Sequence, residues 1–143
     1  MTFREMRESD LPELGRLYAG AFNAAPWFDK WTEEPAARRI SDILHTPGAF
    51  GLVAEEDGVL TGMAAGAAEQ YFDGVVFQLK ELCVRCDLRR RGIGTALMAE
   101  LEKRLRGMGI RSALLFTSEE DLPFYRIQGY HQINGMVMLD KEL

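Results

Sequence analysis

Three consecutive arginines and two closely spaced glycines precede a strongly helical part of the sequence. They are Arg89, Arg90, Arg91, Gly92 and Gly94, in the segment DLRRRGIGTALMAELEKRL. The first turn of a helix has unpaired backbone N–H groups and a partial positive charge, which suit an anion. Glycine lets the backbone approach a ligand because it has no Cβ. The pattern predicts that the amides from Arg90 to Thr95 surround a phosphate pair, with the arginine side chains assisting. The alternative is a solvated basic loop whose glycines only turn the chain.

Two common phosphate-binding loops do not fit this turn. The Walker A pattern, with its lysine followed by serine or threonine, is absent from the sequence. A dinucleotide fingerprint needs glycine or alanine three residues after Gly94, where this chain has Leu97. The remaining pattern is Arg89-x-x-Gly92-x-Gly94.

The spacing of apolar residues predicts the elements that must position this turn. Upstream we expect a strand at 2–7, a helix starting at Ser9 or Asp10, a helix capped by Thr32, two strands around Asp57-Gly58, and a strand at 75–84. Downstream we expect an amphipathic helix from Ile93 to Leu105, a strand at 111–117, a short helix at 120–129, and a terminal hairpin of residues 130–133 and 136–140. The predicted order is β-α-α-β-β-β-α-β-α-β-β, an α/β fold with a mixed sheet and helices packed on its faces.

Composition sets limits on the class of protein. A length of 143 residues with 47% hydrophobic residues fits one domain, residues 1–143, with a core of its own. No apolar run is long enough for a membrane span and the charged start has no signal-peptide core, so we expect a cytoplasmic protein with no membrane partner. The net charge of −5 argues against nucleic acid as a partner, although the local basic run keeps a nucleic-acid-binding module as a remote alternative.

The two cysteines, Cys83 and Cys86, form a single C-x-x-C. A redox pair or half of a zinc site would be the functional interpretations. Zinc needs four ligands, and the only histidines, His45 and His131, do not lie at ligand spacing. We therefore expect no metal and two incidental thiols.

The arginine–glycine turn resembles the signature [QR]-x-x-G-x-[GA] of the GNAT superfamily, the acetyl-CoA-dependent N-acetyltransferases. Its setting resembles the family too, since a strand ending ELCV precedes it and an amphipathic helix and a buried strand follow. The segment FYRIQGY is similar to the family's second landmark, an aromatic-Tyr-x-x-x-Gly-aromatic run. The resemblance covers essentially the whole chain. It implies a mixed, mostly antiparallel central sheet with helices on both faces and two parallel strands that splay apart.

The resemblance assigns the cofactor-binding residues. The pyrophosphate of acetyl-CoA, the cosubstrate, would lie on the turn, and the pantetheine arm would pair with the backbone at the end of the preceding strand. The residues implied are Leu82, Cys83, Val84, Arg89, Arg90, Arg91, Gly92, Ile93, Gly94 and Thr95. Two positions depart from the family pattern: Cys86 replaces a frequent proline, and Ser118 replaces a frequent CoA-contacting asparagine.

The resemblance also assigns the chemistry. Tyr125 matches the family's proton donor to the departing thiolate, and a phenol is protonated at neutral pH. Glu81 is the candidate base, directly or through water, or a contact for a cationic acceptor. The alternatives are a packed aromatic ring for Tyr125 and a plain surface carboxylate for Glu81. Glu69 and Asp73 are weaker candidates for the base. A strand N–H, that of Cys83 or Leu82, would polarise the thioester carbonyl.

Loop aromatics are the candidates for the acceptor site, because exposed aromatic side chains often mark contact surfaces. They are Trp27, Phe28, Trp31, Tyr71 and Phe72. Their alternative role is packing against the sheet.

The overall expectation is direct transfer of an acetyl group to a primary amine of a small molecule in a ternary complex. A non-catalytic acyl-CoA sensor and an enzyme acting on a peptide or protein amine stay open. Terminal hairpins often pair in relatives, so the resemblance also allows a homodimer.

Overall fold

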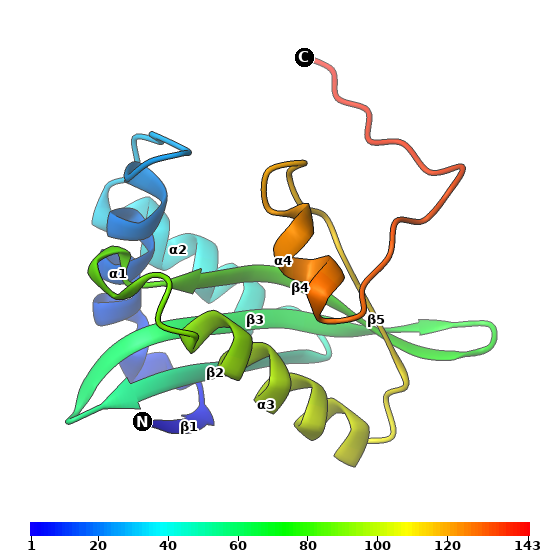
Figure 1. The fold of residues 1–143 in the computed structure, drawn as a ribbon, viewed down its shortest axis with the longest axis horizontal. Helices are drawn as coiled ribbons and strands as arrows, with labels where there is room; N and C mark the ends of the chain where they lie inside the picture. Colours follow the sequence, from blue (N-terminus) through cyan, green and yellow to red (C-terminus); the bar gives the residue numbers. More distant parts are fainter.

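The computed structural model describes residues 1–143 and contains the predicted elements up to the short helix near the C-terminus (Figure 1). They are β1 (Thr2–Glu5), η1 (Glu8–Asp10), α1 (Leu11–Asn23), α2 (Glu33–Leu44), β2 (Ala49–Glu56), β3 (Val59–Tyr71), β4 (Gly74–Val84), η2 (Cys86–Leu88), α3 (Ile93–Gly107), β5 (Ser112–Leu115) and α4 (Leu122–Ile127). No helix combines the length and the apolar character that crossing a bilayer would need.

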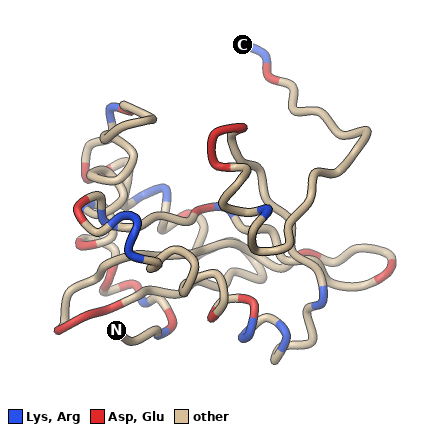
Figure 2. The backbone as a smooth tube through the Cα atoms, viewed as in Figure 1, with Lys and Arg blue, Asp and Glu red and all other residues tan.

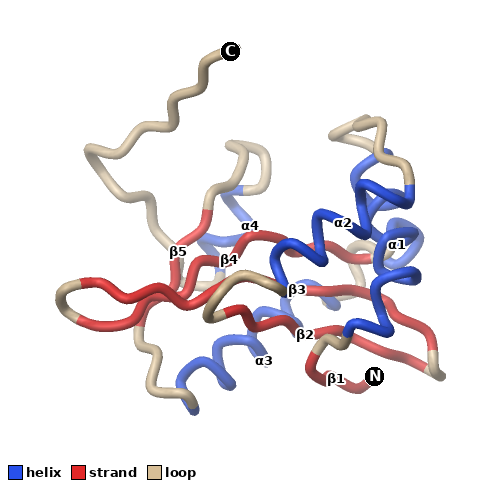
Figure 3. The backbone as a smooth tube through the Cα atoms, turned by 180° about the vertical axis from the view of Figure 1, so that it is seen from behind, coloured by secondary structure: helices blue, strands red, loops and turns tan.

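The five strands form one sheet in the order β1-β2-β3-β4-β5. The first three pairings are antiparallel, and β5 is parallel to β4. Helices α1 and α2 cover one face of this sheet and α3 covers the other (Figures 1 and 3). The predicted fold class, a mostly antiparallel mixed sheet with helices on both faces, is confirmed.

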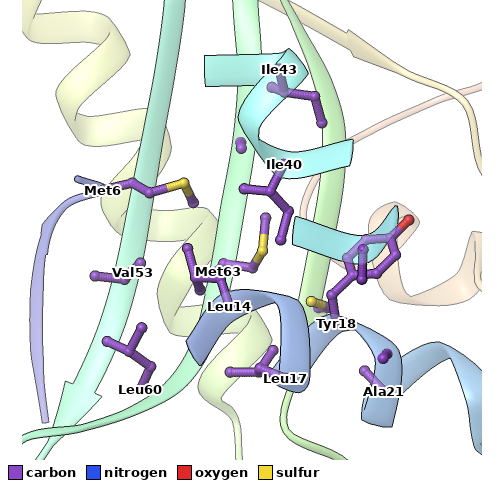
Figure 4. Close-up of a cluster of buried hydrophobic side chains, with 14 residues drawn as sticks. Met6, Leu14, Leu17, Tyr18, Ala21, Ile40, Ile43, Val53, Leu60 and Met63 are labelled. Carbon is purple, nitrogen blue, oxygen red and sulfur yellow. The ribbon is translucent and has the colours of Figure 1, made fainter. Parts of the chain in front are cut away.

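Two buried clusters hold the helices to the sheet. In the first, Leu14 of α1 and Ile40 of α2 are fully buried together with Met63 of β3 (Figure 4). In the second, Leu97 and Leu101 of α3 pack under the opposite face. The helices form because apolar residues recur every three or four positions, which puts them on one side of each helix. The same periodicity fixes which side of α3 faces the sheet, and therefore where its first turn lies.

A β-bulge in β4 reverses which of its side chains face α3 and which face α1 and α2. Ala65 of β3 pairs with Glu81, whereas the next residue, Gly66, pairs with Leu79, so Lys80 is the extra residue. Leu79 packs in the cluster beneath α3, but Cys83 packs in the cluster beneath α1 and α2. Strict alternation would have kept residues 79, 81 and 83 on one face. The bulge therefore moves Glu81 to the face that α1 and α2 cover.

The predicted terminal hairpin is absent. Residues 130–133 and 136–140 form no strands, and the chain from His131 onward is exposed and leads away from the sheet (Figures 1 and 3). The direction of this last segment is set just after α4. Gly129 has φ 93°, and the Tyr130 N–H donates to the Tyr125 carbonyl at 3.1 Å. A strand needs a neighbouring strand for its backbone hydrogen bonds, and this exit takes the segment away from β5 of its own chain.

Substitution of Gly66 tests the close approach of β3 and β4 at the bulge. A Cβ at this position would lie 2.0 Å from the Gln78 carbonyl oxygen, so Gly66→Ala has to push the strands apart. We expect the free energy of unfolding, measured by urea denaturation, to fall by about 1–3 kcal/mol. The control is Gly20→Ala in α1, where no atom lies within 4 Å and where alanine should add about 0.5–1 kcal/mol. Equal effects of the two substitutions would contradict the packing described for the bulge.

Candidate functional site

A cleft opens where β4 and β5 part. Their parallel pairing runs from Val76–Ser112 to Leu79–Leu115 and then stops, while β4 continues to Val84. The cleft has a volume of about 200 Å³. Its lining residues are Phe22, Trp27, Leu79, Lys80, Glu81, Leu82, Leu115, Phe116, Thr117, Ser118, Asp121 and Tyr125. The β4 segment beyond Leu79 pairs with β3 on one side only, so its other edge has backbone groups free for a ligand.

The turn before α3 presents a row of amides with no acceptor in the protein. Arg90 and Gly92 have left-handed backbone conformations, with φ 63° and 81°. The first hydrogen bond of α3 runs from the Ala96 N–H to the Gly92 carbonyl at 3.0 Å, and no amide from Arg90 to Thr95 donates to a backbone or side-chain oxygen. These amides lie at the positive end of α3, so the turn can bind an anion such as a diphosphate.

The start of α3 lies beside the cleft. A Cβ added to Gly94 would be 3.4 Å from the Phe124 ring and 3.7 Å from a methyl of Val84, so α3 begins against both the end of β4 and α4. Figure 2 shows the basic stretch before α3 as a continuous run of Lys and Arg colour beside α1. An anion on the turn would thus be next to the open edge of β4.

The three arginines of the turn differ in what they contact. Arg89 donates to the carbonyl of Ala25 at 2.7 Å and to that of Ala21, and its guanidinium lies 4.7 Å from the centre of the Trp27 ring. Its charge therefore stabilises the carbonyl end of α1, where a cation is favourable. The side chains of Arg90 and Arg91 are exposed. Only these two remain free to assist the amides in holding an anion.

The Glu81 carboxylate is held by two residues from the helices above it. Its Oε1 atom accepts from the Tyr18 hydroxyl at 2.9 Å and from Arg39 Nε at 3.1 Å. Burial, and then the charge of Glu81, raise the pKa of Tyr18 well above its usual range, so this phenol stays a donor. Tyr18 and Arg39 were missed by sequence reasoning. Tyr18 reads as one more apolar-face residue of α1, and no local motif marks Arg39.

Tyr125 has its ring in the cleft wall and a hydroxyl that donates to no protein group. The ring packs edge-on against Phe124, with centroids 5.0 Å apart, and against Tyr130 at 5.9 Å. Burial, followed by the charges of Asp121 and Glu81, raises the pKa of Tyr125 to about 12. The phenol therefore keeps its proton throughout the neutral range and is available as a proton donor.

The predicted backbone ligands lie on the part of β4 that has left β5. Leu82 lines the cleft, and Val84 touches the start of α3. The Cys83 side chain is buried, and this burial raises the pKa of its thiol well above the usual range, so it stays protonated. Cys86 is exposed. The structure contains no group of three or more His, Cys, Asp or Glu side chains placed to hold a metal ion.

The structure separates the five loop aromatics. Trp27 lines the cleft. Trp31 does not line it and packs edge-on against Tyr18, with centroids 5.0 Å apart. Phe28 is exposed and does not line the cleft. Tyr71 and Phe72 form the tip of the β3–β4 hairpin, which projects beyond the body of the domain (Figure 1). Gly74 at that tip is five residue steps, roughly 17 Å of extended strand, from Leu79 in the cleft. Neither the tip aromatics nor the nearby Glu69 and Asp73 line the cleft.

Comparison with known families agrees with this arrangement. Residues 11–130 match the model of the Acetyltransferase (GNAT) family. The chain belongs to the GNAT acetyltransferases. The matched range begins at α1 and ends after α4, so it includes the cleft, the α3 turn and Tyr125. The resemblance read from the turn and from FYRIQGY is confirmed.

Individual relatives cover almost the whole chain. An acetyltransferase of Sodalis glossinidius is 30% identical over 146 residues, covering 100% of this chain and 96% of its own length. An aminoglycoside acetyltransferase from an uncultured soil metagenomic sample, solved with sisomicin, has a TM-score of 0.76 at 19% identity, covering 99% of this chain and 95% of that one. A predicted acetyltransferase of Clostridium acetobutylicum, solved with acetyl-CoA, has a TM-score of 0.73 at 17% identity, covering 97% and 95%. At these identities the two solved structures show a shared fold.

Replacing Arg89 tests its role as a link between the turn and α1. In Arg89→Gln the carbonyls of Ala21 and Ala25 lose a cationic partner and Trp27 loses the guanidinium over its ring. We expect the free energy of unfolding to fall by about 1–2 kcal/mol and the tryptophan fluorescence to change. Arg91→Gln is the control, since that side chain is exposed. It should keep the free energy of unfolding within about 0.5 kcal/mol of the parent and leave the tryptophan fluorescence unchanged. Equal results for the two variants would show that Arg89 does not link the turn to α1.

Proposed function

We propose that the protein is an N-acetyltransferase that moves an acetyl group from acetyl-CoA to a primary amine of a small molecule, directly, in a ternary complex. The observation that carries the proposal is the row of unpaired amides from Arg90 to Thr95 beside the open edge of β4. Membership of the GNAT family supports it. The fold shared with a protein solved with acetyl-CoA and with an aminoglycoside acetyltransferase solved with sisomicin supports the donor and the acceptor class.

The amides of the α3 turn would hold the pyrophosphate of acetyl-CoA. Arg90 and Arg91 add charge from their exposed side chains, whereas Arg89 acts by fixing the turn to α1. The backbone from Leu82 to Val84 would pair with the pantetheine arm as a further strand would, because β5 has left this edge open. This arrangement directs the thioester into the cleft, towards Glu81 and Tyr125.

The acceptor amine would enter beside Glu81. The amine enters as its neutral form, and its nitrogen attacks the thioester carbon while an N–H of the Leu82–Cys83 segment stabilises the oxyanion. As the C–N bond forms, Glu81 takes the proton that the nitrogen must lose, directly or through a water molecule, while Tyr18 and Arg39 fix the carboxylate. When the C–S bond breaks, the thiolate takes the Tyr125 hydroxyl proton, and the products are the acetamide and free CoA. The Tyr125 phenolate then regains a proton from water, and Glu81 releases its proton to water. Trp27 supplies an aromatic wall that would suit an ammonium-bearing acceptor.

Thr95→Pro tests whether one amide of the α3 turn contributes to acetyl-CoA binding. Proline deletes the Thr95 N–H, which has no partner in the protein, and the first turn of a helix tolerates proline. We expect the Kd for acetyl-CoA, measured by calorimetry, to rise roughly tenfold or more, because a hydrogen bond to a charged group is lost. Thr95→Ala keeps the N–H and should bind as the parent does.

The parent protein should be stabilised against heat by acetyl-CoA and not by ATP or NAD at equal concentration. Stabilisation by ATP or NAD alone, or a Thr95→Pro affinity equal to that of Thr95→Ala, would contradict the assignment of the turn.

Tyr125→Phe tests the proton donor. We expect kcat for acetyl transfer to a panel of primary amines, an aminoglycoside, an amino sugar and a polyamine, to fall by roughly 10²–10⁴-fold with acetyl-CoA affinity unchanged. Tyr130→Phe, which changes the neighbouring ring, should keep parental kcat.

The pH dependence of the rate tests the same donor. Because the pKa of Tyr125 is raised to about 12, the donor form is retained as pH rises and is lost only near that value. Tyr125 should therefore cause no loss of rate below about pH 10. Full turnover by Tyr125→Phe would contradict the role, and thiol release with none of the amines would favour an acyl-CoA sensor.

A further inference from the structure

Lys80 carries a positive charge in the cleft that no protein group neutralises. It is the extra residue of the β4 bulge, where Lys80 and Glu81 together lie opposite the single residue Ala65. Both side chains line the cleft. Lys80 is half-buried, and it forms no ion pair. A cation that is partly removed from water without a counter-ion favours the binding of an anion.

The two carboxylates that line the cleft are held by other residues. Glu81 Oε1 accepts from the Tyr18 hydroxyl and from Arg39 Nε. Asp121, the other carboxylate, accepts from the Ser118 hydroxyl at 3.2 Å. Neither carboxylate forms an ion pair with Lys80. The counter-ion of Lys80 therefore has to come from a bound molecule.

Arg39 adds a second cationic group with free donors. Its Nε atom lies 3.1 Å from Glu81 Oε1, and its side chain is 42% exposed. The two terminal nitrogens of its guanidinium donate to no protein group. Paired guanidinium nitrogens suit the oxygens of a carboxylate or a phosphate. Glu81 is thus flanked by Lys80 along the strand and by Arg39 from α2.

The diphosphate of acetyl-CoA is not placed to be this anion. The α3 turn, where the diphosphate would lie, touches β4 at Val84. Lys80 is four residue steps, roughly 13 Å of extended strand, before Val84, on the side away from the turn. The thioester end of acetyl-CoA, which lies nearer to Glu81, is uncharged. The anion facing Lys80 would therefore belong to the acceptor.

We propose that the acceptor carries a carboxylate or a phosphate close to its amine, and that Lys80 binds this group with the free nitrogens of Arg39 assisting. The inference rests on the proposed function, in which Glu81 takes the proton of the same amine. A diamine or a polyamine would instead bring a second cation towards Lys80 and Arg39, which like-charge repulsion disfavours. Lys80 is thus a specificity-determining residue that selects acceptors by the charge beside their amine.

Matched pairs of acceptors test the charge preference. Glucosamine 6-phosphate and glucosamine differ by a phosphate, and L-phenylalanine and phenethylamine differ by a carboxylate. We expect kcat/KM of the anionic member to exceed that of its partner roughly tenfold or more in at least one pair, because a charged hydrogen-bonded contact is gained. The pair that responds distinguishes phosphate from carboxylate. Equal or lower kcat/KM of the anionic member in both pairs would overturn the inference.

Substitution of Lys80 tests whether this residue sets the preference. Lys80→Met should abolish the difference between the two members of the responding pair, and Lys80→Glu should reverse it. A structural role of Lys80 would instead lower kcat/KM of both members alike. The control is Lys103→Met, since Lys103 lies on α3 with a side chain that is 79% exposed, and should keep parental values. A preference that survives Lys80→Glu would overturn the inference.

Failure of the inference can be told from failure of the proposed function. The Kd for acetyl-CoA, measured by calorimetry, should be parental in all three variants. Transfer confined to amines without an anionic group, such as a polyamine, would overturn the inference and leave the proposed function standing. No transfer to any amine while acetyl-CoA still binds would contradict the proposed function, and the inference with it.

Discussion

The site depends on a set of backbone amides that the protein leaves without acceptors. The left-handed conformations of Arg90 and Gly92 turn the chain so that the amides up to Thr95 precede the first hydrogen bond of α3. A folded chain normally pairs such groups, and because these have no acceptor in the protein they are available to a ligand with several oxygens. The neighbouring elements fix this turn in place: Arg89 joins it to α1, and Gly94 begins α3 against Phe124 and Val84.

One irregularity in β4 supplies the second side of the site. The extra residue at Lys80 moves Glu81 to the face of α1 and α2, where Tyr18 and Arg39 can hold it, while Leu79 stays on the face of α3. The pairing with β5 ends at Leu79, so within a few residues β4 reverses the faces of its side chains and loses one of its two neighbouring strands. A single strand can thus offer backbone to a donor and a carboxylate to an acceptor.

The features that sequence could predict are those with local causes. The α3 turn follows from glycines and arginines at the start of an amphipathic helix, and the fold class follows from periodicity and turn residues. Features that depend on distant partners were out of reach. Tyr18 and Arg39 meet Glu81 from other elements, the bulge is invisible to strand alternation, and Tyr71 and Phe72 are held away from the cleft by the length of a hairpin. The predicted terminal hairpin of residues 130–133 and 136–140 was wrong, because strands need a paired edge and the chain does not bring this segment to one.

A titration of the isotopically labelled protein with acetyl-CoA, followed by amide ¹H–¹⁵N NMR, tests the central claim most directly. The account predicts that the resonances of Arg90 to Thr95 and of Leu82 to Val84 shift together and saturably, while those of β1, on the opposite edge of the sheet, stay in place. Saturable binding of acetyl-CoA that leaves the Arg90–Thr95 amides unshifted would contradict it.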